Sequence, residues 1–314
     1  MKNIFAIGLD IGGSHITAGV IAVNEMKLIE VSLYKESFDS NLQADQVMDI
    51  WERVIRTSWK NSGVEEFQGI SACMPGPFDY EKGICWIKGQ TKYEHFYGLD
   101  VRKLIQERLN LSDDFPVLFE NDADCFGKGE VFKNTENRSK KVMAVTLGTG
   151  LGACFIDKAE AITAGNQVPT DGELYNTLYK DSIAEDYVSA RGLIASYYKL
   201  SGTKRSSGLE IFNLATAGDE IAAQAFRNFG EDLAVIVAPW LKTFEAECFI
   251  IGGKIANASS FFLPAFEEKL KEEDCNIPIL ISSDNEIAAL LGATSLLYKN
   301  YFNQDESAFS DLKK

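Results

Sequence analysis

Histidine is scarce in this 314-residue chain, and the cysteine spacings that hold metals or disulfide frameworks are missing. Only two histidines occur, which excludes a histidine-rich metal centre. The six cysteines are scattered without a C-x-x-C pair and mostly have apolar neighbours. We therefore expect reduced thiols that act as small core residues.

Long apolar runs and an excess of basic residues are also missing. No stretch approaches the length of a membrane span, and residues 1–11 lack a signal-peptide layout because Asp10 interrupts their short apolar run. Lys and Arg number 31 against 46 Asp and Glu, for a formal net charge of −15. This balance argues against nucleic acid or an anionic membrane as the main partner. We expect a cytoplasmic protein with small-molecule partners, and leave a homodimer open.

Two glycine-dense turns lie in different halves of the chain, at residues 8–14 and 147–152. Strand-like apolar runs flank each turn, which predicts β-hairpins and not the strand–turn–helix units of a Rossmann or P-loop site. Glycine lets backbone N–H groups approach an anion closely. One such hairpin is usually only a tight turn, but two in different halves predict a nucleotide held between two lobes.

Further residues extend this interpretation. Asp10 is a carboxylate inside an apolar strand, where burial is costly unless it is paired or binds a cation. Mg²⁺ carried in with ATP would satisfy it, so we expect Asp10 to hold this metal. A third glycine pair follows the buried strand at 248–251, a common position for a ligand in an α/β sheet. The expected ATP-binding residues are Asp10, Gly12, Gly13, Ser14, Gly148, Thr149, Gly150, Gly252 and Gly253.

The order of expected elements repeats itself, and the length favours two domains. Helices are expected at 42–60, 99–109, 123–132, 183–190, 209–217, 219–243, 259–271 and 286–298. Strands are expected at 3–11, 16–23, 27–34, 67–73, 116–119, 141–147, 150–156, 248–251 and 277–281, with a hairpin near 78–87. We predict an N-terminal lobe over 1–120 completed by the helix near 285–300, a C-terminal lobe over 121–284, and a disordered polar tail at 303–314.

A polar segment, Glu120-Asn121-Asp122-Ala123-Asp124, follows the strand at 116–119 and opens a helix. Such residues are common helix caps, but their predicted position at the lobe junction favours a catalytic role. An aspartate there could accept a proton from a substrate hydroxyl as it attacks the γ-phosphate. We choose Asp122 over Asp124, because Asp122 lies just after the strand whereas Asp124 enters the helix.

Five segments at 8–14, 72–77, 120–130, 147–152 and 250–253 together resemble the motifs of the ROK family of sugar kinases and sugar-responsive repressors. The resemblance runs from residue 7 to about residue 293. It implies an α/β, two-lobed actin-like ATPase (ribonuclease H-like) fold with an interdomain active-site cleft. It also implies ATP-dependent phosphorylation of a hexose or hexose derivative, of the glucokinase or N-acetylhexosamine kinase type.

The resemblance further implies roles for individual residues. Asp122 would be the catalytic base, and the sugar would contact Gly76, Asn121, Asp122, Glu173, Asn176 and Glu185. The family's E-x-G-H motif reads here Glu173-Leu174-Tyr175-Asn176, and the family's zinc-binding cysteines are missing around 180–189. With asparagine for histidine and no cysteines there, a tetrahedral zinc site cannot form, so we expect no structural zinc.

Three alternatives stay open. A sugar-sensing ROK regulator would carry a DNA-binding region before the first phosphate strand, whereas that strand is expected here from residue 3. An actin-like filament or chaperone ATPase would not need the polyol-binding set around Asp122. A catalytically silent sugar-binding protein is compatible with the altered zinc region.

Overall fold

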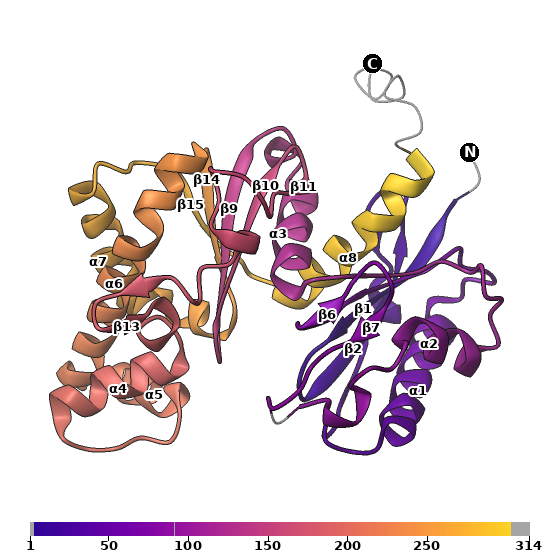
Figure 1. The fold of residues 1–314 in the computed structure, drawn as a ribbon. Coiled ribbons are helices and arrows are strands. Elements are labelled where there is room, and N and C mark those ends of the chain that lie inside the picture. The colour runs from indigo at the N-terminus through magenta and orange to yellow at the C-terminus, as the bar shows by residue number, and fades with distance from the viewer. Residues whose placement is uncertain (1–2, 91, 303–314) are drawn as a thin grey trace. The chain divides into compact units, whose positions relative to one another are not determined.

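The structure is a computed structural model that describes residues 3–90 and 92–302, so the predicted disordered tail lies outside the described residues. The chain divides into two compact units (Figure 1). Unit 1 comprises Met1–Lys133 and Glu286–Lys314, and unit 2 comprises Asn134–Asn285. Each unit is described by itself. The lobe boundary expected at residue 121 and the cleft between the lobes stay predictions.

Unit 1 is built on a sheet with the strand order β3-β2-β1-β5-β8, to which β4 is added beside β2. Its strands are β1 (Phe5–Ile11), β2 (His15–Ala22), β3 (Lys27–Leu28), β4 (Tyr34–Ser37), β5 (Ile70–Cys73) and β8 (Val117–Glu120). β1 and β2 are antiparallel, which confirms the first predicted hairpin, while β5 is parallel to both β1 and β8. The strand expected at 27–34 is divided into β3 and β4 by a 3-10 turn, η1 (Glu30–Ser32).

Alternation along β1 assigns the two faces of this sheet. Ile7 and Leu9 pack in one core cluster with buried residues of α1 (Ala44–Ser62) and α2 (Val101–Leu109). Gly8 faces the other side, where an added Cβ would lie 2.9 Å from the carbonyl oxygen of Leu290 in α8 (Asn285–Phe302). Asp10, two residues on, therefore lies on the α8 side of the strand.

The helix α3 (Asp122–Lys133) crosses α8 at two glycines. A Cβ on Gly129 would lie 1.7 Å from the carbonyl oxygen of Ala288, and one on Gly292 equally close to that of Cys125. No real side chain tolerates such a distance, so both glycines are required by the backbone contact. The crossing fixes the start of α3, which carries the predicted catalytic segment. The short strands β6 (Phe78–Asp79) and β7 (Ile84–Cys85) form the hairpin expected near 78–87.

Unit 2 contains a second sheet, with the strand order β11-β10-β9-β14-β15. Its strands are β9 (Lys141–Leu147), β10 (Leu151–Asp157), β11 (Glu160–Ala161), β14 (Cys248–Gly252) and β15 (Ile279–Ile281). β9 and β10 form the second predicted hairpin, and β14 runs parallel to both β9 and β15. A separate ladder joins β12 (Leu178–Tyr179) to β13 (Ser182–Ile183).

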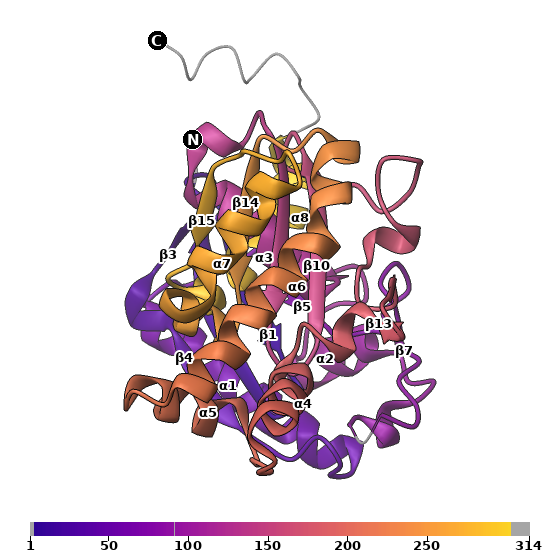
Figure 2. The same cartoon turned by 90° about the vertical axis from the view of Figure 1, so that its left-hand side faces the viewer.

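Helices α6 (Glu220–Phe244) and α7 (Ser259–Glu272) lie side by side against this sheet, and both views show them (Figures 1 and 2). The helix expected at 183–190 is wrong. The chain there forms β13 and a 3-10 turn, η5 (Ala184–Asp186), and the helix α4 (Ala190–Ser201) begins only after them. The side chain of Ser189 caps α4 by accepting from the Gly192 N–H. The helix α5 (Gly208–Thr216) follows as predicted.

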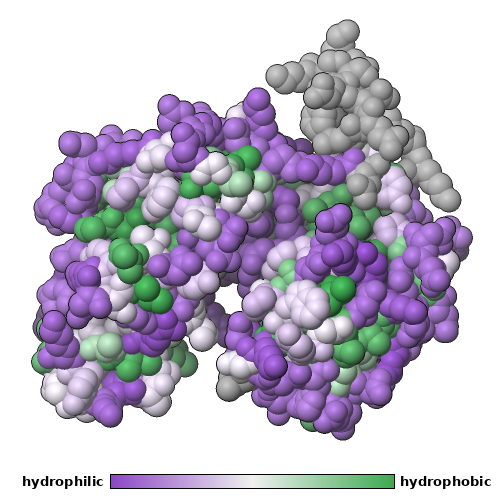
Figure 3. Space-filling model, viewed as in Figure 1, coloured by the Kyte–Doolittle hydropathy of each residue, from purple (hydrophilic) through white to green (hydrophobic). Residues whose placement is uncertain are grey.

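All six cysteines are buried and none of them forms a disulfide, which agrees with thiols that act as small core residues. The surface visible in Figure 3 is mostly hydrophilic with scattered apolar patches, as the composition leads one to expect. Within residues 3–90 and 92–302, no helix has the combined length and hydropathy of a membrane span.

Candidate active site

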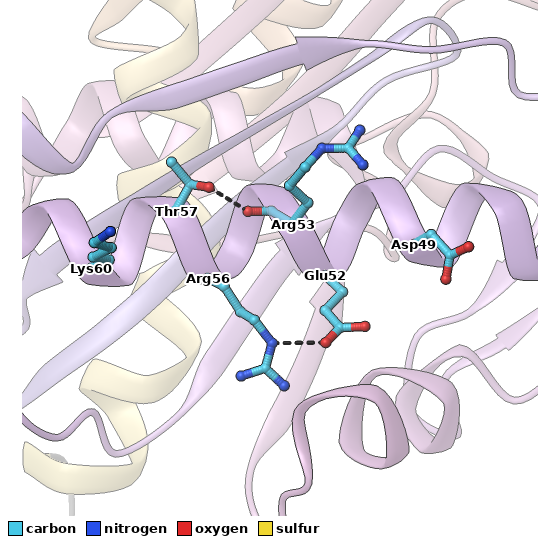
Figure 4. Close-up of a pocket in the computed structure, with 6 residues that line it drawn as sticks. All are labelled: Asp49, Glu52, Arg53, Arg56, Thr57 and Lys60. Carbon is cyan, nitrogen blue, oxygen red and sulfur yellow. Dashed lines mark hydrogen bonds and ion pairs between the residues drawn. The ribbon is translucent and has the colours of Figure 1, made fainter.

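A pocket on the outer face of α1 is unrelated to the predicted chemistry. Its lining residues are Asp49, Glu52, Arg53, Arg56, Thr57 and Lys60 (Figure 4). Arg56 pairs with Glu52 at 2.7 Å, an ordinary arrangement of a solvated helix face. None of the residues predicted for catalysis or binding lines it. The candidate site is therefore built from the glycine turns and the residues around them.

The first glycine turn joins β1 to β2 in unit 1. The Gly12 N–H donates to the carbonyl of His15 at 2.9 Å, which closes the turn. A Cβ on Gly12 would lie 2.8 Å from the His15 ring, so that ring leaves no room for a side chain. Gly13 and Ser14 are exposed. The turn thus presents backbone to solvent at the end of a buried strand.

Asp10 lies just before this turn and is half-buried. Burial and, to a smaller extent, the nearby carboxylates of Asp122 and Glu286 together raise the pKa of its carboxyl to about 7, and the Lys35 ammonium opposes them in part. A carboxyl crowded by other acids gains most from a cation, because a metal ion relieves both desolvation and repulsion. Asp10 therefore fits the expected role of a Mg²⁺ ligand.

Asp122 is the first residue of α3, one position earlier than the predicted helix start. Asn121 precedes it and caps the helix, since its Oδ1 accepts from the backbone N–H of Ala123 at 2.8 Å and of Asp124 at 3.4 Å. Helix capping, the alternative weighed for this segment, is thus real for Asn121. Asp122, the next residue, is exposed.

The electrostatics of Asp122 combine two opposing effects. Dense surrounding protein raises the pKa of its carboxyl by desolvation, and the Lys92 ammonium and nearby backbone N–H groups lower it in part. The residue is nevertheless exposed to solvent. Its carboxylate is therefore accessible from solvent, although the surrounding protein limits its hydration. Asp122 also raises the pKa of Asp10, so the two carboxylates act on each other.

Tyr80 connects the catalytic segment to the segment at 72–77. Its hydroxyl donates to the carbonyl of Met74 at 3.0 Å and accepts from the Asn121 side-chain amide at 3.3 Å. A Cβ on the half-buried Gly76 would lie 3.4 Å from the same hydroxyl. The sequence analysis missed Tyr80, whose only signal was an aromatic residue in the predicted hairpin.

The second glycine turn joins β9 to β10 in unit 2, and Glu185 supports it. Glu185 accepts from the Leu151 N–H at 3.0 Å, and a Cβ on Gly150 would lie 2.4 Å from the same oxygen. Its other carboxylate oxygen pairs with Arg191 at 2.8 Å. The carbonyl of Gly148 accepts from the first N–H of α4, that of Ala190, at 2.8 Å. Glu185 was expected to contact sugar, but in this structure both of its oxygens have protein partners.

The third glycine turn lies directly against the second. Gly253 has φ of 86°, and a Cβ there would lie 2.3 Å from the carbonyl oxygen of Leu147. Its N–H donates to the Asn285 side chain at 2.9 Å. A Cβ on Gly148 would meet nothing within 4 Å, and Thr149 is exposed. Unit 2 therefore brings its predicted nucleotide-binding glycines together, with open space above Gly148.

The remaining predicted sugar ligands follow in unit 2. Glu173 is half-buried and Asn176 is exposed. Between them, Tyr175 has a raised pKa chiefly because the Glu173 carboxylate lies near its hydroxyl, with a smaller effect of Glu185. Tyr175 thus belongs to the same polar group, although the sequence analysis assigned it no role. Arg191 was missed as well, because its pairing with Glu185 had no sequence signal.

No group of three or more His, Cys, Asp or Glu side chains able to hold a metal ion exists in the part of the chain that the structure describes. The expected absence of zinc stays a prediction. The predicted site residues thus form two sets. Unit 1 contains the first glycine turn, Asp10, Gly76, Asn121 and Asp122, and unit 2 contains the other two glycine turns, Glu173, Asn176 and Glu185.

Curated relatives of this chain include an enzyme and a regulator. The chain is similar to the glucokinase of Thermotoga maritima, with 23% identity over 325 residues that cover 95% of this chain and 98% of the relative. It is also similar to the xylose repressor of Caldicellulosiruptor bescii, with 23% identity over 336 residues that cover 96% of this chain and 80% of the repressor.

Solved structures show the same fold. A ROK hexokinase from Thermus thermophilus matches with a TM-score of 0.76 and 20% identity, covering 95% of this chain and 100% of that one. A ROK family glucokinase from Streptomyces griseus, in complex with glucose and AMPPNP, matches with a TM-score of 0.72 and 20% identity, covering 93% and 98%. The predicted α/β class and actin-like ATPase fold are thereby confirmed. The family model described as ROK family matches residues 6–300, and the chain therefore belongs to the ROK family.

Proposed function

We propose that this chain is an ATP-dependent kinase that phosphorylates a hexose or hexose derivative, with Asp122 as the base. The observation that carries the proposal is the exposed Asp122 carboxylate, held at the start of α3 by the Asn121 cap and electrostatically coupled to Asp10 beside the first glycine turn. The similarity to a glucokinase, and to a kinase structure with glucose and AMPPNP, supports the substrate class.

In the proposed reaction, Asp122 accepts the proton of the sugar hydroxyl. The hydroxyl oxygen forms a bond to the γ-phosphorus, the bond from that phosphorus to the bridging oxygen breaks, and ADP leaves. Phosphoryl transfer needs positioning and charge neutralisation more than covalent chemistry, and a base, several N–H donors and the metal that accompanies ATP would together meet that need. Asp122 must be ionised for this role; desolvation raises the pKa of its carboxyl, and the Lys92 ammonium and backbone N–H groups offset part of that rise.

The other proposed roles follow the two sets of residues. Asp10 would hold the Mg²⁺ that accompanies ATP, and this ion would neutralise phosphate charge when bound. The glycine turns would hold ATP through Gly12, Gly13, Ser14, Gly148, Thr149, Gly150, Gly252 and Gly253. Glu173, Asn176, Asn121 and Gly76 would contact the sugar, while Glu185 would act both on the sugar and on the turn that it supports.

A panel of hexoses, N-acetylhexosamines and pentoses with coupled ADP detection tests the proposal. We expect at least one sugar to stimulate ATP turnover, and Asp122→Asn to lower that turnover by ~10²–10⁴-fold while sugar binding persists. Asp124→Asn is the matched control on the same helix and should stay within a few-fold of the wild type. Near-normal turnover by Asp122→Asn would exclude this residue as the base.

A sugar-sensing regulator is the second candidate, because a xylose repressor is among the similar proteins. The net charge of −15 disfavours direct DNA binding. A regulator or a silent sugar-binding protein would bind a panel sugar in calorimetry without any ATP turnover. Calorimetry and the ATP turnover assay on the same purified protein therefore distinguish the candidate functions.

A further inference from the structure

Lys92 lies beside the first glycine turn, although it is far from that turn in sequence. A Cβ added to Gly13 would lie 3.6 Å from the Cδ of Lys92, which is an ordinary van der Waals contact. Lys92 is half-buried, whereas Gly13 is exposed. The aliphatic part of the lysine therefore lies beside Gly13, within reach of the turn.

Tyr93, the next residue, fixes this position. Its hydroxyl donates to the carbonyl of Gly12 at 2.6 Å, and its N–H donates to the carbonyl of Ser40 at 3.0 Å. Its ring is fully buried and packs edge-on against Trp51, with ring centroids 6.1 Å apart. Tyr93 also has φ of 54°, the left-handed region that a side chain adopts only at a cost. The hydrogen bond from Tyr93 to Gly12 therefore holds the neighbouring residue Lys92 beside the turn.

The charges around the turn show why a lysine there matters. The other two lysines of this region are already paired, Lys35 with Glu286 and Lys128 with Glu120. Lys92 forms no ion pair with any residue that the structure describes, and its positive charge partly offsets the effect of burial on the pKa of the Asp122 carboxyl. Asp10 and Asp122 add carboxyls that these two ion pairs do not neutralise, and in their ionised form they would repel a phosphate. An ammonium at the turn offsets that repulsion where the phosphate would approach.

We propose that Lys92 binds a phosphoryl oxygen at the Gly12–Gly13 turn, as a charged partner to the backbone N–H groups. Lysine serves as a point charge for phosphate, and glycine removes the side chain that would otherwise keep the anion away. The inference rests on the proposed function, since it names a further residue of the same phosphate site. The phosphoryl group could belong to the nucleotide or to a phosphorylated sugar, and binding experiments separate these sources.

Calorimetric titration with Mg–AMPPNP, glucose and glucose 6-phosphate tests the proposal on the wild type, Lys92→Met and Lys92→Arg. Lys88→Met is the matched control, because it removes the same charge from an exposed lysine that lies over the Tyr97 ring. Because Lys92→Met removes a charge-assisted hydrogen bond, we expect it to lower the affinity for the phosphate-bearing ligand by roughly 10–100-fold. We expect Lys92→Arg to recover most of that affinity, and glucose and Lys88→Met to show no comparable change.

If Lys92→Met loses affinity only for AMPPNP, the phosphoryl group that Lys92 binds belongs to the nucleotide. If it loses affinity only for glucose 6-phosphate, that group belongs to the phosphorylated sugar. Equal affinities of Lys92→Met and the wild type for both phosphates overturn the proposal, as does an equal loss in Lys92→Met and Lys92→Arg. Melting temperatures of all variants reveal any loss caused by unfolding. If the wild type itself binds no AMPPNP and no sugar stimulates ATP turnover, the proposed function fails, which is a separate result.

Discussion

At the scale of single residues, the desolvated carboxyl of Asp10 is costly in the absence of a cation. Its pKa of about 7 shows that the folded protein favours the protonated form far more than a free aspartate does. For such a group, the stabilisation is complete below the ordinary pKa near 3.8 and is lost as the pH rises through about 7. At alkaline pH the charged Asp10 therefore lowers the free energy of unfolding, as binding residues often do.

Replacing Asp10 by Asn should remove the loss of folding stability that accompanies ionisation of Asp10 at higher pH. We expect Asp10→Asn to unfold at a higher temperature than the wild type at pH 8 without Mg²⁺, and the difference to shrink by pH 5. Thermal unfolding from pH 5 to pH 8 measures this, with Asp113→Asn as the control because Asp113 is exposed. If Asp10→Asn raised the melting temperature as much at pH 5 as at pH 8, the ionisation of a desolvated Asp10 would not be the cause of the lower stability.

At the scale of elements, Glu185 joins a short 3-10 turn to the second glycine turn. The Glu185 carboxylate accepts from the Leu151 N–H, so removal of this side chain should disturb the turn as well as any contact with the sugar. Glu173 is a matched comparison, since it is another carboxylate predicted to contact the sugar, whereas the Leu151 N–H of the second glycine turn donates to Glu185.

We expect Glu185→Ala to weaken both AMPPNP and sugar binding by roughly tenfold, the effect of losing a charged hydrogen-bond partner. Glu173→Ala should weaken the sugar alone. Calorimetry with both ligands on both variants measures how far each substitution lowers the affinity for AMPPNP and for the sugar. Unchanged AMPPNP affinity in Glu185→Ala would mean that the turn keeps its shape without this support.

The crossing of α3 and α8 determines where Asp122 is placed. A methyl group at Gly129 would meet the Ala288 carbonyl at 1.7 Å, so the helices would have to separate. We expect Gly129→Ala to cost at least the ~1–3 kcal/mol typical of overpacking and to lower turnover with it. Gly208→Ala is the control, because its Cβ would meet only Leu193 at 3.5 Å and alanine favours a helix. Chemical denaturation gives both values, and equal stabilities would show that the crossing adjusts freely.

At the scale of the whole molecule, the departure from the zinc motif leads to a prediction about the metal content. Asn176 is exposed on a turn, and residues 180–189 contain no cysteine. We expect elemental analysis of the purified protein to find no stoichiometric zinc, and chelators to affect activity only by removing Mg²⁺. Restoring Mg²⁺ alone should then recover full turnover. About one zinc per chain would contradict this expectation and would require ligands from other segments of the chain.

Patterns of local origin were predictable from the sequence. The two hairpins follow from apolar runs that flank glycine turns, and most helices follow from apolar spacing. The helix expected at 183–190 was wrong because contacts with residues earlier in the chain hold this segment as the end of β13 and a 3-10 turn. The Glu185 N–H donates to the carbonyl of Tyr175 at 3.1 Å, and Ser189 caps a helix that begins only after it. Tertiary contacts here overrode a local preference.

The sequence by itself determined the family motifs, the glycine turns and the candidate base, because each depends on residues that are neighbours in the chain. Only the tertiary structure decided which distant side chains support them. Tyr93 donates to Gly12 from 81 residues away, and Lys92 follows it to the first turn. Arg191 and Tyr80 likewise gain their partners through folding. Such contacts join positions whose separation in sequence has no periodicity, so no local pattern can reveal them.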